Sequence, residues 1–175
     1  MQRATNMIQA KTRSLVAATA MLSCLLGCLM APGAARAQAY DLSVTRTAED
    51  FYKVVGKDIV IQTRRCGVPA TAKNSVFKAD AQKLMFVDAG KDCDVKAAYG
   101  PTMSNPGQFN VTVNHTAGDW YEVSGATTYI KTESCDRPAE GRQATLSLGA
   151  ANAGRLLFSD GSSCLVDGVY DELRI

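Results

Sequence analysis

Four cysteines could form disulfide bonds, and all four follow the apolar N-terminal stretch of the chain. They are Cys66, Cys93, Cys135 and Cys164. In an exported chain, four thiols favour two disulfides, because the compartment beyond the membrane is oxidising. Zinc sites built from cysteines usually contain a close C-x₂₋₄-C pair, and none of these four forms such a pair. The sequence therefore predicts two disulfides, no metal site and no cofactor.

Residues that could support nucleophilic catalysis are few. His115 is the one histidine of the chain, so a Ser-His-Asp or Cys-His site would depend on it alone. We interpret it as an exposed loop histidine that precedes a strand at 119–121. The sequence has no Gly-x-Ser-x-Gly elbow, no phosphate-binding glycine loop and no HExxH motif.

Two aspartates, Asp88 and Asp160, recur at matching positions in two similar stretches of the chain. A pair of carboxylates could act as the acid and the base of a hydrolase. Both lie in predicted turns, where Asp is favoured for its local backbone hydrogen bonds. We prefer the turn interpretation, so no catalytic residue is predicted and the chain is not expected to be an enzyme.

The chain contains an internal duplication, which appears when it is compared with itself at an offset of 69 residues. Matching positions include Leu42 with Val111, Asp50 with Asp119, Tyr52 with Tyr121, Gly56 with Gly125, Ile61 with Ile130 and Cys66 with Cys135. After a few inserted residues the match resumes, with Phe86 on Phe158, Cys93 on Cys164 and Tyr99 on Tyr170. We predict one repeat at 38–99 and a second at 110–175. The stretch between them, 100–109, contains two prolines and two glycines and is predicted to be a linker.

Each repeat is predicted to be a short-stranded antiparallel β-meander of about 60 residues, because its apolar residues come in short bursts separated by turn residues. Strands of the first repeat are expected at 42–45, 51–55, 59–64, 75–79, 83–87 and 93–97. Hairpin turns are expected at 56–58 and 88–90, and at the Asp160-Gly161 pair of the second repeat. The fold class is therefore all-β, with little helix beyond the N-terminal segment.

Disulfide pairing follows from the duplication, because four cysteines allow three pairings and the sequence alone cannot choose among them. If one repeat once folded alone, its two cysteines bonded to each other. This argument predicts Cys66 with Cys93 and Cys135 with Cys164, so that one disulfide stabilises each repeat.

The N-terminal segment 1–37 has the features of a signal peptide, namely a basic start, an uncharged apolar run over 14–31 and the small residues of Ala35-Arg36-Ala37. Cleavage after Ala37 is expected, and cleavage after Ala39 is nearly as favourable. A second interpretation is a lipoprotein signal that ends at residue 27, with Cys28 acylated. An uncleaved membrane anchor is a third.

Removal of 1–37 changes the charge of the chain. That segment holds four of the nineteen basic residues and none of the seventeen acidic ones, so the formal net charge falls from +2 to −2. A nucleic-acid partner would need a concentrated basic surface, so none is expected. Contact with a membrane is expected only through the signal segment or a lipid anchor.

These observations predict an exported bacterial protein that is periplasmic or secreted, or anchored as a lipoprotein. The expected function is nonenzymatic binding of another protein or envelope macromolecule, as an inhibitor or immunity protein, since a small stapled β scaffold presents preorganised loops. A structural or accessory envelope lipoprotein is the alternative, and a hydrolase that uses acidic residues is the third.

Overall fold

Twelve β-strands make up the structure, a computed structural model that describes residues 38–174. The first six are β1 (Ala39–Ala48), β2 (Phe51–Val54), β3 (Val60–Thr63), β4 (Lys73–Lys78), β5 (Lys83–Phe86) and β6 (Lys91–Pro101). The second six are β7 (Gly107–Ala117), β8 (Trp120–Val123), β9 (Thr128–Glu133), β10 (Arg142–Leu148), β11 (Gly154–Phe158) and β12 (Ser163–Glu172). The predicted all-β class is confirmed for this part of the chain, whose single helical element is the short 3₁₀ turn η1 (Ala150–Asn152). The signal segment and Cys28 lie outside the described residues.

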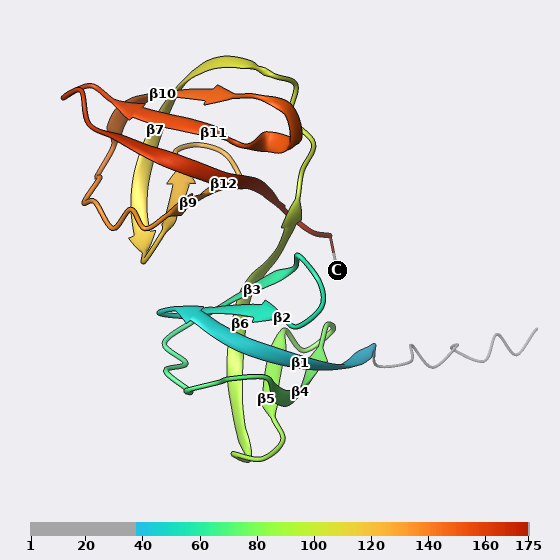
Figure 1. Cartoon of the computed structure of the whole chain (residues 1–175). Helices are drawn as coiled ribbons and strands as arrows, with labels where there is room; N and C mark the ends of the chain where they lie inside the picture. The colour runs from blue at the N-terminus through green and yellow to red at the C-terminus, as the bar shows by residue number, and fades with distance from the viewer. Residues whose placement is uncertain (1–37, 175) are drawn as a thin grey trace, which may run out of the picture. The chain divides into compact units, whose positions relative to one another are not determined.

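The first six strands close into a ring, which we call the first ring (Figure 1). Each strand is antiparallel to its neighbours, and the order around the ring is β1, β2, β3, β6, β5, β4 and back to β1. The predicted simple meander is therefore wrong in its connectivity. After β3 the chain crosses to the far side of β1 instead of pairing β4 with β3. Closure gives every strand two neighbours, whereas an open meander would leave two exposed edges.

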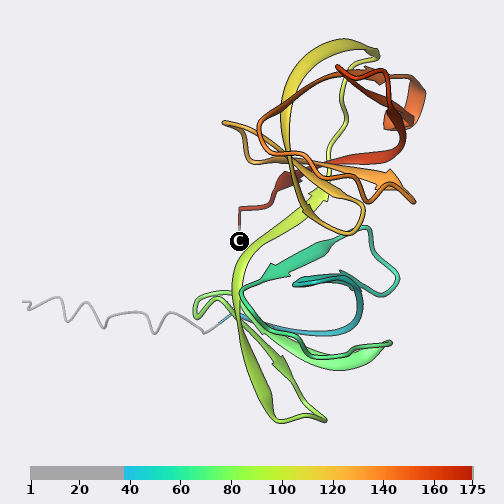
Figure 2. The same ribbon diagram turned by 90° about the vertical axis from the view of Figure 1, so that its left-hand side faces the viewer.

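The second six strands form a second ring with the same order of pairings: β7, β8, β9, β12, β11, β10 and back to β7 (Figure 1 and Figure 2). Registers also correspond, because Val44 opposes Val54 in the first ring and Val113 opposes Val123 in the second. In both rings the register of the first strand shifts just before its C-terminal end. The two halves thus share one topology.

Hairpin turns occur where the sequence predicted them, although with a different backbone geometry. In the β5–β6 turn the amide of Gly90 donates to the carbonyl of Val87 at 3.3 Å, and in the β11–β12 turn Gly161 donates to Phe158 at 3.0 Å. The φ angles are +57° at Gly90 and +84° at Gly161, whereas the preceding residue has negative φ in each turn. In both turns glycine alone takes the left-handed conformation. The tight Asp-Gly turn that the sequence predicts would instead need positive φ at two consecutive residues.

The predicted linker 100–109 is shorter in the structure. Strand β6 continues through Pro101 and β7 begins at Gly107, so only residues 102–106 lie between strands. The physical reason is a non-local partner, because the end of β6 pairs with the end of β12, where Gly100 opposes Asp171. Gly and Pro in a sequence mark breaks, but such a pairing can still hold them in a strand.

Three apolar clusters form the interior. One lies inside each ring and includes its cysteines, and a third joins residues of both rings. In the third cluster the rings of Phe51 and Trp120 stack at 5.2 Å, and those of Tyr99 and Tyr129 lie 4.6 Å apart. Buried Gln62 accepts a hydrogen bond from the Tyr99 hydroxyl at 3.1 Å. The described residues fall within one compact unit, and none of their helical segments is long and apolar enough to cross a membrane.

Candidate functional site

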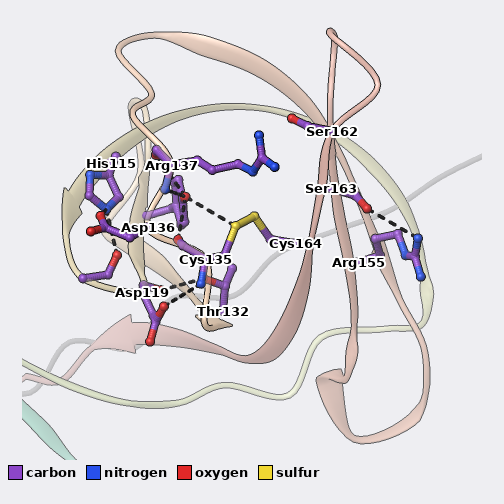
Figure 3. Close-up of a disulfide and its surroundings, with 12 residues drawn as sticks. His115, Asp119, Thr132, Cys135, Asp136, Arg137, Arg155, Ser162, Ser163 and Cys164 are labelled. Carbon is purple, nitrogen blue, oxygen red and sulfur yellow. Dashed lines mark hydrogen bonds and ion pairs between the residues drawn. A yellow bond between two sulfur atoms is a disulfide. The ribbon is translucent and has the colours of Figure 1, made fainter.

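Both disulfides join cysteines of the same ring, as the duplication argument predicts. Cys66 bonds to Cys93 with a Cα–Cα distance of 5.4 Å, and Cys135 bonds to Cys164 with a Cα–Cα distance of 5.8 Å. Each connects the loop that follows the third strand of a ring to the sixth strand. Figure 3 shows the disulfide of the second ring, between Cys135 and Cys164. Such disulfides are compatible with an oxidising extracellular or periplasmic compartment.

Two aspartates hold the same loops from the turn between the first and second strands of each ring. The Asp50 carboxylate accepts a hydrogen bond from the Cys66 amide at 2.7 Å, and Asp119 accepts one from the Cys135 amide at 2.7 Å (Figure 3). Asp50 also accepts one from the Arg65 amide at 2.8 Å. The sequence showed Asp50 and Asp119 as matching residues, but only the structure shows this fixed role beside the cysteines.

Buried tyrosines complete the attachment of these loops. The Tyr52 hydroxyl donates to the Val68 carbonyl at 2.9 Å, and the Tyr121 hydroxyl lies 2.9 Å from the Cys135 carbonyl. Burial raises the pKa of both hydroxyls. The aromatic pairs at 51–52 and 120–121 are therefore part of the interior and do not line a groove.

His115 lies within strand β7 and its side chain is largely covered, which corrects the prediction of an exposed loop residue. Its Nε2 atom is 2.7 Å from the Gly118 carbonyl oxygen and 3.0 Å from an Asp136 carboxylate oxygen (Figure 3). Cys135, next to Asp136, is in a disulfide. These contacts stabilise the β7–β8 turn, and no serine or cysteine hydrogen-bonds to the ring among residues 38–174.

Asp88 and Asp160 lie in corresponding turns of the two different rings. The Asp160 carboxylate accepts hydrogen bonds from the Ser162 hydroxyl at 2.6 Å and from the Ser162 amide at 2.9 Å, and it pairs with the Arg142 guanidinium. The Ser162 hydrogen bonds, with help from Arg142, lower the pKa of Asp160 to about 2. A carboxylate held ionised in this way is suited to a turn and poorly suited to act as a general acid.

No group of three or more His, Cys, Asp or Glu side chains could hold a metal ion within 38–174.

The best-formed candidate site is an apolar pocket at one end of the first ring, with a volume of about 260 Å³. Its walls come from the start of β1, from the end of β2 through the β2–β3 turn into β3, from β4 and β6, and from the segment after β12. The lining residues are Tyr40, Asp41, Leu42, Val54, Lys57, Ile59, Ile61, Phe77, Ala98 and Leu173. We call this the apolar pocket. Eight of these ten side chains are apolar or aromatic, which is the usual lining of a ligand site.

Polar groups of the apolar pocket are at its mouth. Asp41 and Lys57 are exposed to solvent, whereas Ile61 and Ala98 are buried. The rings of Tyr40 and Phe77 stack at 6.2 Å, which braces one wall. The mouth thus carries one charge of each sign above an apolar interior.

The corresponding end of the second ring is built differently. Its β10–β11 connection is longer and contains η1, whose Asn152 is buried. The Asn152 side chain accepts a hydrogen bond from the Ser104 amide at 3.0 Å and donates one to the Thr102 carbonyl. The residues inserted in the second half therefore bind the segment between the rings, whereas the tight β4–β5 turn leaves the first ring's end open.

Comparisons with protein-family models, with curated proteins and with solved structures find no match to this chain.

Proposed function

We propose that this chain is an exported, nonenzymatic binding protein that holds an apolar side chain of a partner protein in the apolar pocket. The pocket itself carries the proposal. A volume of about 260 Å³ lies below the range of about 300–1,000 Å³ that is typical of small-molecule and cofactor sites. It suits one or two large apolar side chains, which are the usual anchors of a protein interface.

The charges at the mouth favour a protein partner over a free fatty acid. Asp41 and Lys57 both line the pocket, so a carboxylate headgroup would meet a like charge beside its counterion. A peptide backbone is neutral and carries both donors and acceptors, which matches a mouth of mixed sign.

Rigidity of the first ring supports this function. The Cys66–Cys93 disulfide and the hydrogen bonds of Asp50 hold the loop after β3, and the ring of strands is closed. A preorganised surface loses little conformational entropy on binding. We propose a periplasmic or secreted location, and an inhibitor or immunity role against a hydrolase or toxin.

We also propose that the two rings arose by tandem duplication. The shared order of strand pairings and the equivalent disulfides support this origin. On this view, insertion at 149–153 closed one end of the second ring, and the first ring kept the binding role.

An accessory envelope lipoprotein is the second candidate, favoured by the Leu25-Leu26-Gly27-Cys28 motif. Intact-mass measurement of the mature protein separates the two. A chain that begins at Gln38 or Tyr40 supports the exported soluble protein, and an acylated chain that begins at Cys28 supports the lipoprotein.

The binding proposal is tested by NMR titration of the ¹⁵N-labelled mature protein with N-acetyl-L-leucinamide. We expect shifts at the pocket residues and a Kd in the low millimolar range, since a ligand of this size gains about 0.3 kcal/mol per non-hydrogen atom. Ile59→Glu places a carboxylate in the pocket wall and should weaken binding at least about tenfold.

The matched control is Val55→Glu, on the same β2–β3 turn, because Val55 is 50% exposed and does not line the pocket. It should leave the Kd unchanged. Equal binding by wild type and Ile59→Glu would show that the pocket is not the site. Sodium decanoate binding more than tenfold tighter than the leucine amide would identify an acyl chain as the ligand and overturn the protein-partner proposal.

A further inference from the structure

The segment that follows β12 lies along the end of β6 at the apolar pocket. Strand β5 pairs with β6 only as far as Asp94, and beyond that point β12 pairs with Tyr99, Gly100 and Pro101. One residue further, the Leu173 amide donates to the Ala98 carbonyl at 2.8 Å. The chain's own last described residues therefore occupy this side of β6 as an extended peptide.

Leu173 also contributes its side chain to the pocket. It is one of the ten lining residues and packs, half-buried, against the core of the first ring. Gly100 lies beside this side chain, and a Cβ atom at that position would be 2.9 Å from Leu173 Cδ2. An extended segment whose leucine side chain forms part of the pocket wall is thus already present in the structure.

We infer that Leu173 is a displaceable internal ligand, and that a partner binds as an extended peptide whose apolar side chain and backbone amide replace those of Leu173. This inference rests on the proposed function and adds the partner's conformation and a competitor built into the chain. Peptides that add to a free strand edge gain affinity from backbone hydrogen bonds and specificity from a side-chain pocket. The Ala98 carbonyl and the apolar pocket supply these two elements.

When a segment of the same chain competes for the site, the apparent Kd equals the intrinsic Kd divided by the fraction of molecules in which the site is free. Leu173→Ala removes the competing side chain. Gly100→Ala keeps the leucine, but its Cβ atom would lie 2.9 Å from Leu173 Cδ2, so the leucine side chain must shift from its present position. Both variants should therefore bind a peptide ligand more tightly than the wild type.

The experiment is an NMR titration of full-length mature wild type, Leu173→Ala and Gly100→Ala with N-acetyl-L-leucine methylamide. We expect roughly five- to tenfold tighter binding in each variant. Leu165→Ala is the matched control, because Leu165 is an exposed leucine of β12 outside the pocket, and its Kd should equal that of the wild type. Ligand should also accelerate hydrogen exchange of the Leu173 amide in the wild type.

If the wild type binds the ligand and either variant binds it equally or more weakly, the displacement of Leu173 by a partner is overturned. The proposed function would still stand. Failure of the wild type and both variants to bind would overturn the proposed function itself. Binding by the variants with none detectable in the wild type would support both. A Leu173 amide that becomes more protected on ligand addition would contradict the replacement of its hydrogen bond.

Discussion

Asp160 shows how a recurring carboxylate can look catalytic in the sequence and serve a turn in the structure. Its oxygens face the Ser162 amide and hydroxyl and the Arg142 guanidinium. Each of these partners favours the ionised form, which explains the lowered pKa. Asp88 lies exposed in the corresponding turn of the first ring, so the hydrogen bonds that explain the turn aspartate are those of Asp160.

The ionisation of Asp160 should contribute to the pH dependence of the free energy of unfolding. Because its pKa falls from 3.8 to about 2 on folding, its contribution is fully present above about pH 4 and is lost as the pH falls through about 2. Asp160→Asn should therefore be less stable than the wild type at pH 6, and the difference should shrink towards pH 2. Urea unfolding at several pH values measures this.

Asp88→Asn provides the comparison, since Asp88 is exposed in the corresponding turn of the first ring. Its stability should follow the wild type across the same pH range. An Asp160→Asn deficit that persists unchanged at pH 2 would contradict an electrostatic origin.

The residue contacts that the sequence did not predict join residues that are far apart along the chain. The sequence predicts His115 in a loop, but in the structure it pairs with Tyr121 as part of β7 and contacts Asp136. The hydrogen bond from the Cys66 amide to the Asp50 carboxylate spans sixteen residues. Neither contact leaves a local pattern, although the match of Asp50 with Asp119 pointed to a shared role.

At the scale of elements, each disulfide joins a loop to the strand that closes the ring. The cysteines are separated by 27 residues in the first ring and by 29 in the second. In the chain-entropy model, a disulfide that closes a loop of this size raises the free energy of unfolding by about 3–4 kcal/mol. Replacing Cys66 and Cys93 together by alanine should lower the free energy of unfolding by about that amount.

The double replacement of Cys135 and Cys164 serves as the matched variant, and a similar loss is expected because the separation is nearly equal. Guanidinium unfolding followed by circular dichroism measures both. A nonreducing peptide map of the wild type that links Cys66 to a cysteine of the second ring would contradict the pairing.

Strand positions in the first ring were predicted to within a few residues, because apolar bursts and turn glycines are local signals. The lengths of β1 and β6 were underestimated, since their extra residues are held by β4 and β12, which are distant in the sequence. For the same reason the sequence suggested a meander. Nothing local says that β4 returns to β1 instead of pairing with β3.

At the scale of the whole molecule, the two rings share an apolar cluster centred on Trp120. Its side chain is 1% exposed, stacks on Phe51 of the first ring and contacts Tyr170 edge-on. Trp120→Ala should cost about 3–5 kcal/mol. Because the cavity borders both rings, amide hydrogen exchange should rise in both.

Phe86→Ala is the control for this coupling, since Phe86 belongs to the cluster inside the first ring alone. Its effect on hydrogen exchange should be larger in the first ring than in the second. Increased exchange confined to the second ring in Trp120→Ala would show that the shared cluster does not couple the two.

The apolar pocket could not have been predicted from the sequence, because five separate stretches of the chain supply its walls. Leu42 and Leu173 lie at opposite ends of the described chain, yet both pack against the first ring's core. Only closure of the ring and the β6–β12 pairing bring them together. The class of function stays a prediction from the sequence, and the position of the candidate pocket required the topology.

Closure of the rings also bears on how the protein behaves in a crowded compartment. Each of the twelve strands has a hydrogen-bonded neighbour on both sides. Exposed strand edges are the usual templates for intermolecular β-sheet growth. The described part of the chain offers other chains little unpaired backbone to extend, so the mature protein should remain monodisperse at high concentration.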